Sequence, residues 1–129
     1  MRVPKLVEKQ RILDIPIFEF SVVVILTNDI KRSALKRKNI LDIREDDDMA
    51  WTEFSCGLTV DSLQTAYVFL PFYPRGGTRN LIISHESSHA ATSLLRSMNG
   101  GRSIGICQNN EELLAYAVGY IAAFIHKVF

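Results

Sequence analysis

The sequence predicts a single α+β domain over residues 1–129, with a small three-stranded, mostly antiparallel sheet packed on two long helices. Three segments alternate apolar and polar residues with the period of a β-strand, and two segments in the C-terminal half carry apolar residues at helical spacing. A chain of this length, with 47% hydrophobic residues, can bury one core. The expected order of elements is β-α-β-β-α-α.

The first strand is expected over residues 15–26. Its apolar face consists of alternating residues, namely Phe18, Phe20, Val22, Val24 and Leu26. Asn28 and Asp29 then end the strand and can cap a helix over about residues 30–41. That helix carries a basic run, but no aromatic residues interrupt the run. The solvated face of an amphipathic helix therefore explains it better than a nucleic-acid patch.

The other two strands are expected to form a hairpin. Residues 51–60 alternate, with Leu58 and Val60 among those on one face, and residues 66–72 return after a turn at Asp61-Ser62. The acidic run that precedes the hairpin lacks the glycine and ligand spacing of an EF-hand loop, so a solvated connection is expected there.

The next helix contains the most informative sequence of the chain, His85-Glu86-Ser87-Ser88-His89. Thr78 can cap this helix, which is expected to run to about Met98. Two imidazoles four residues apart share one helical face and can bind one metal ion, for which zinc is well suited. Glu86 lies about 100° around the helix, where it can take a proton from a water on the metal.

The flanks of this sequence are apolar nearly all round, which indicates a buried helix rather than a surface helix with paired histidines. A catalytic zinc generally needs a third protein ligand. Glu111 and Glu112 open the final helix, expected over about residues 109–127, and either can fold back beside the motif. The face of Glu112 continues through small residues that would allow close helix packing, which favours Glu112 and leaves Glu111 as the alternative.

The sequence His85-Glu86-Ser87-Ser88-His89, followed by Glu112 three residues before Ala115, resembles the gluzincin-type zinc metallopeptidases in a minimal, single-domain form. Small bacterial and phage-associated members are the most similar, and the resemblance covers about residues 65–125. It implies a zincin-like fold, zinc bound by His85, His89 and Glu112, and water activation by Glu86. The chain has Tyr116 where larger gluzincins carry an acidic residue, so the usual carboxylate support for a zinc-bound histidine is unaccounted for.

The expected function is zinc-dependent hydrolysis of a peptide bond, with Glu86 as general base and Tyr116 as the nearest phenol for an oxyanion donor. Tyr73 and Arg102, which lie in expected loops, are alternatives for that donor. His126 is not expected to take part, because it lies about 21 Å beyond Glu112 along one helix. The alternative is a catalytically silent zinc-binding interaction module or a virion-associated protein.

A peptide or protein substrate is expected along the strand that ends near Phe72, because Pro71 suits a sheet edge to which an extended peptide can add. A net charge of +1 offers no field for nucleic acid or anionic membrane. The longest apolar stretch, residues 113–125, is shorter than a membrane span. Two cysteines and an N-terminus without an apolar signal core predict a cytoplasmic protein.

Overall fold

The computed structural model describes residues 4–41, 57–72, 78–98 and 108–129 of this α+β protein. The strands are β1 (Glu8–Ile15), β2 (Phe20–Thr27), β3 (Leu58–Ser62) and β4 (Thr65–Pro71). The helices are a 3-10 turn η1 (Pro16–Phe18), α1 (Ile30–Lys36), α2 (Lys38–Leu41), α4 (Thr78–Met98) and α5 (Gln108–Val128). The two long C-terminal helices therefore have nearly the bounds that the sequence predicts.

The described strands form one four-stranded mixed sheet of order β1-β2-β4-β3, not the expected three-stranded one. β2 and β4 pair in parallel, while β1–β2 and β3–β4 are antiparallel. β1 has no recognisable strand pattern in the sequence, because its Glu8–Arg11 half is polar and most of its side chains are exposed. β1 is held by backbone pairing with β2 and by a few half-buried residues such as Leu13, rather than by an alternating apolar face.

β4 lies between β2 and β3, so it is not an edge of the described sheet. Its Pro71, expected to mark an edge, stands at the end of the strand opposite Thr27. The strand ending near Phe72 therefore offers no free edge among the described strands, and a peptide substrate stays a prediction. Within the described part of the chain, the edge strand beside the motif helix is β3.

The start of β2 and the turn after β3 lie at positions other than those expected. β2 begins at Phe20 rather than residue 15, because the preceding residues form η1 and Glu19 adopts a positive φ of 49°. In the second hairpin, Asp61 and Ser62 still belong to β3, and Gln64 has a positive φ of 56° in the turn that follows. Of the expected strand over residues 51–60, the part before Gly57 lies outside the described residues, as does the acidic run.

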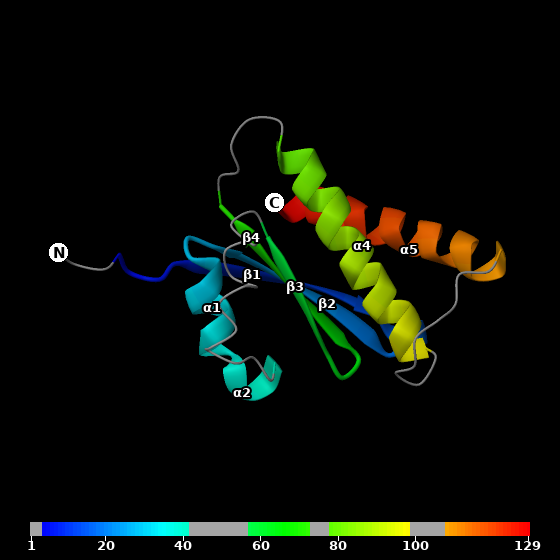
Figure 1. Ribbon diagram of the computed structural model, residues 1–129, viewed down its shortest axis with the longest axis horizontal. Helices are drawn as coiled ribbons and strands as arrows, with labels where there is room; N and C mark the ends of the chain where they lie inside the picture. Colours follow the sequence, from blue (N-terminus) through cyan, green and yellow to red (C-terminus); the bar gives the residue numbers. More distant parts are fainter. Residues whose placement is uncertain (1–3, 42–56, 73–77, 99–107) are drawn as a thin grey trace.

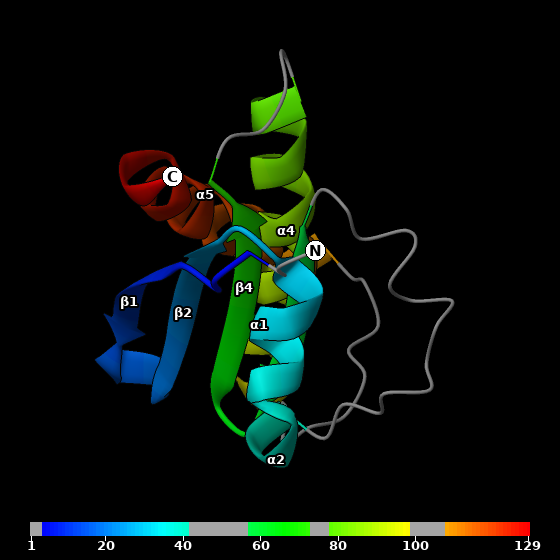
Figure 2. The ribbon, with the colours of Figure 1, turned by 90° about the vertical axis from the view of Figure 1, so that its left-hand side faces the viewer.

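The sheet lies between two helical layers, with α1 and α2 on one face and α4 and α5 on the other (Figure 1, Figure 2). Alternate β2 residues contribute to the two cores, Val22 and Val24 on the α4/α5 face and Val23 and Ile25 on the α1/α2 face. β2 is therefore buried on both faces, which accounts for its nearly unbroken apolar sequence.

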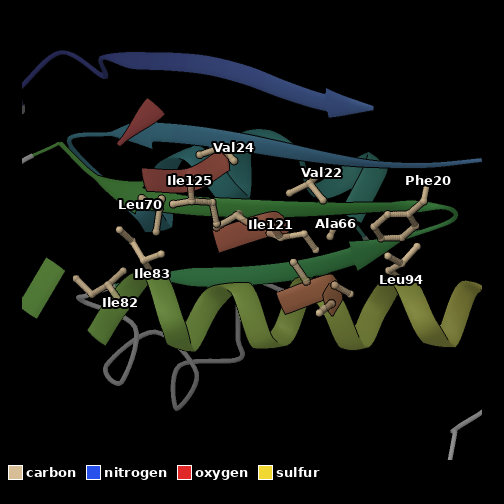
Figure 3. Close-up of a cluster of buried hydrophobic side chains, with 14 of the residues drawn as sticks. Phe20, Val22, Val24, Ala66, Leu70, Ile82, Ile83, Leu94, Ile121 and Ile125 are labelled. Carbon is tan, nitrogen blue, oxygen red and sulfur yellow. The ribbon is translucent and has the colours of Figure 1, made fainter. Parts of the chain in front are cut away.

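The larger core positions the motif helix. Ile82, Ile83 and Leu94 of α4 and Ile121 and Ile125 of α5 pack against the sheet (Figure 3). These contacts fix the rotation of α4 about its axis and so fix which motif side chains face the sheet. No helix among the described residues combines the length and hydropathy needed to cross a membrane.

Candidate metal centre

His85 and His89 lie one turn apart on one face of α4, as their spacing predicts. That face is exposed, whereas the apolar flanks of the motif led us to expect a buried helix. Their Nε2 atoms are 3.2 Å apart and their ring centroids are 4.7 Å apart. Two nitrogens bound tetrahedrally to one zinc at about 2.0–2.1 Å would be about 3.3 Å apart. The imidazole pair therefore has the separation that a shared zinc ion requires.

Glu86 completes a group whose three ligand atoms, one from each of His85, Glu86 and His89, all lie within 4.8 Å of one another. Within the described residues this is the one group of three or more such side chains close enough to hold a metal ion. Imidazole and carboxylate are ligands that suit zinc. The donor set thus fits a metal ion, which His85 and His89 would hold with the Glu86 carboxylate beside it.

Glu86 is buried, with 3% of its surface exposed, although both neighbouring histidines are exposed. Burial raises the pKa of its carboxyl, and the Thr59 hydroxyl bond and the two histidines offset this rise only in part. The Thr59 hydroxyl donates to Glu86 Oε1 over 3.0 Å. A buried carboxylate with a raised pKa beside a metal-binding pair is suited to accept a proton.

Gly57 and Thr59, both next to Glu86, are site residues that the sequence analysis did not identify. A Cβ at Gly57 would lie 3.1 Å from Glu86 Cγ and 3.2 Å from Cδ and Oε2. The sequence does carry a signal for the direction in which these residues face. Leu58 and Val60 face the α1/α2 core, so Gly57 and Thr59, which alternate with them, must face α4. The pairing of those residues with Glu86 depends on tertiary packing, which the sequence does not reveal.

The structure does not bring Glu111 or Glu112 to the histidine pair. Both are exposed at the start of α5, and neither belongs to the group around Glu86. α5 packs on the opposite side of α4, where Leu94 and Met98 line an apolar groove together with α5 residues. Leu94 follows His85 by nine residues, about two and a half helical turns, so the two point in opposite directions.

Tyr116, the expected oxyanion donor, is 71% exposed and lines the same groove on the α5 side of α4. His126 lies outside the candidate centre: its Nδ1 is 3.1 Å from Arg79 Nη1, and its backbone oxygen accepts a bond from Arg79 Nη2. Tyr73 and Arg102, the alternative donors, lie outside the described residues.

Comparison with known proteins finds no matching family model, no matching curated protein and no matching solved structure. The function is therefore proposed from the geometry of the site, which consists of His85, Glu86, His89 and the residues around them.

Proposed function

We propose that this domain is a zinc-dependent peptidase in which His85 and His89 bind the metal and Glu86 is the general base. The observation that carries this proposal is the buried Glu86 carboxyl, with its raised pKa, next to two imidazole nitrogens 3.2 Å apart. A zinc ion at this pair would supply Lewis-acid polarisation of a peptide carbonyl and a water more acidic than bulk water.

The chain's own residues perform the proton transfers. Glu86 accepts the proton of the attacking water and then delivers it to the departing amine nitrogen as the peptide bond breaks. The Thr59 hydroxyl bonds to Oε1 of Glu86, which leaves Oε2 as the oxygen for proton transfer. Low exposure of the carboxyl keeps bulk water from replacing the reacting one.

The substrate of this proposal is an extended peptide paired with the edge of β3. Among the described strands β3 is the edge strand next to α4, and Thr59 of β3 and Gly57 just before it lie against Glu86. A peptide that adds to this edge by backbone hydrogen bonds would run beside the histidine pair. This corrected edge replaces the β4 edge expected from sequence.

The test compares wild type with Glu86→Gln for bound zinc and for hydrolysis of a quenched-fluorescence peptide library. The amide keeps the shape of the side chain but cannot accept the proton, so we expect bound zinc to be retained and hydrolysis to fall by about 10²–10⁴-fold. Hydrolysis at the wild-type rate would contradict the role of Glu86. Zinc bound by a wild type that hydrolyses no peptide would instead identify a silent zinc-binding module.

A further inference from the structure

Thr59 of β3 and Gly57, the residue just before this strand, lie against the side chain of Glu86 across the gap between sheet and helix. Thr59 donates to Oε1, and the backbone of Gly57 lies against Cγ, Cδ and Oε2. We propose that Thr59 and Gly57 are positioning residues that keep Glu86 on the β3 side of the histidine pair, as a base rather than a metal ligand. The catalytic part of this inference rests on the proposed peptidase function, while the positioning part does not.

Glu86 needs such a restraint because it is close enough to bind the metal itself. A ligand oxygen of its carboxylate lies within 4.8 Å of the ligand nitrogens of His85 and His89. Carboxylates bind zinc at about 2.0–2.2 Å, and a glutamate side chain can rotate about three bonds. A carboxylate bound to the metal would no longer be free to take a proton from water.

Thr59 supplies a directional restraint. Its hydroxyl lies 3.0 Å from Glu86 Oε1 and 3.4 Å from the Glu86 backbone oxygen, so one side chain contacts both ends of the glutamate. The hydroxyl has one proton, and the nearer, charge-bearing carboxylate oxygen is the better acceptor. Oε1 is thereby held toward β3.

Gly57 supplies a steric restraint. A Cβ at this position would be nearer to Cγ, Cδ and Oε2 of Glu86 than nearly all Cβ atoms in proteins are to a neighbouring atom. All three atoms belong to the side chain that must stay in place. A methyl group there would displace the carboxyl from β3 by a few tenths of an ångström or more. Glycine is needed at this position for space, because no other residue lets the backbone approach so closely.

The first experiment removes the hydroxyl with Thr59→Val and restores it with Thr59→Ser. We expect Thr59→Val to lower kcat about 10–100-fold, with KM within about twofold of wild type, and Thr59→Ser to recover most of the loss. The matched control is Thr92→Val, which deletes a hydroxyl on α4 that bonds to the Ser88 backbone oxygen and not to Glu86. A Thr59→Val enzyme with wild-type kcat would overturn the positioning role.

The second readout is coordination in protein loaded with Co²⁺ in place of zinc. If Thr59 keeps the carboxylate off the metal, Thr59→Val should change the visible absorption bands toward higher coordination and should not weaken Co²⁺ binding. Thr92→Val should leave the spectrum unchanged. A wild-type spectrum in Thr59→Val would contradict the proposal even where the rate has fallen.

The third experiment uses Gly57→Ala, with Gly119→Ala as the matched control, because a Cβ at Gly119 meets no described atom within 4 Å. Crystal structures of the metal-free proteins should show the Glu86 carboxyl displaced from its wild-type position beside residue 59 in both Gly57→Ala and Thr59→Val. The carboxyl should be unmoved in Gly119→Ala. This readout needs neither metal nor hydrolysis, so it separates failure of the positioning role from failure of the peptidase function. An unmoved carboxyl in both Gly57→Ala and Thr59→Val would overturn the proposal.

Discussion

Two carboxyl groups, Glu8 on β1 and Glu86 on α4, are half-buried and buried respectively, and their pKa values shift in opposite directions. At Glu8, burial raises the pKa, but Lys36 Nζ at 2.7 Å and Arg37 Nη1 at 2.6 Å together lower it further than burial raises it. At Glu86, burial dominates, and the Thr59 hydroxyl and two histidines leave the pKa raised.

The difference shows how a fold separates a structural carboxylate from a reactive one. Two cations fix the charge of Glu8, which then ties β1 to α1 as an ion-pair network. Glu86 receives a hydrogen bond from a neutral hydroxyl instead. No cation of the described residues forms an ion pair with it, and burial keeps the pKa of its carboxyl above the ordinary value.

The largest effect is expected from removing a group that would bind the zinc ion. His89→Ala should weaken zinc binding by more than about 100-fold, because a single imidazole cannot hold the ion that two imidazoles share. Zinc bound after dialysis against a zinc-buffered chelator measures this loss. His126→Ala is the control, since His126 bonds to Arg79 and not to the candidate centre. Loss of zinc from His126→Ala but not from His89→Ala would refute the assignment.

The next effect concerns Glu8. Glu8→Gln should lower the free energy of unfolding by about 1.5–3 kcal/mol at pH 7, because charge-assisted bonds to Lys36 and Arg37 are lost. Since the pKa of Glu8 is lowered in the folded state, its contribution is present above the unfolded pKa and is lost as the pH falls through the folded pKa. We therefore expect the difference in unfolding free energy between Glu8→Gln and wild type, measured by urea unfolding, to be smaller at pH 3 than at pH 7.

Two further variants sharpen this result. Lys36 is 60% exposed in its side chain and Arg37 only 16%, so Lys36→Gln should cost less stability than Arg37→Gln. Equal costs, or a Glu8→Gln penalty that grows in acid, would contradict the ion-pair account.

Sequence patterns gave the long helices and the histidine pair because both depend on local spacing. The shared face of His85 and His89 follows from 3.6-residue periodicity, and the bounds of α4 follow from local start and stop signals such as Thr78. β1 was missed because an edge strand of charged residues gains its stability from backbone pairing with β2, which leaves no apolar alternation.

The surroundings of Glu86 were missed for a different reason. Thr59 and Gly57 reach the carboxyl only because β3 is placed at the sheet edge beside α4, about 27 residues away in the chain. The choice of β4 as an edge failed for the same reason, since strand order is set by packing. Helical faces likewise did not reveal on which side of α4 the helix α5 would pack.

A smaller, opposite pH dependence is expected at Glu86 in metal-free protein. Because its pKa is raised in the folded state, its contribution to stability is present below the unfolded pKa and is lost as the pH rises through the folded pKa. Glu86→Gln, which carries no charge, should therefore gain stability relative to wild type between acidic and neutral pH. Urea unfolding in chelator at several pH values measures this trend. A trend like that of Glu8→Gln would mean that Glu86 is stabilised as an anion.

The smallest effect is expected at a third carboxylate, Glu112, which the sequence favours as a zinc ligand. Glu112 is exposed on α5, and α5 packs on the side of α4 that faces away from His85 and His89. Glu112→Ala should therefore leave zinc affinity within about twofold of wild type, as should its neighbour variant Glu111→Ala, because neither removes a group near the histidine pair. Zinc titration against a competing chelator measures both. If Glu112→Ala alone released the metal, α5 would have to swing its first turn to the histidine side when zinc binds. The metal would then have a third protein ligand, and the buried Glu86 would remain the base.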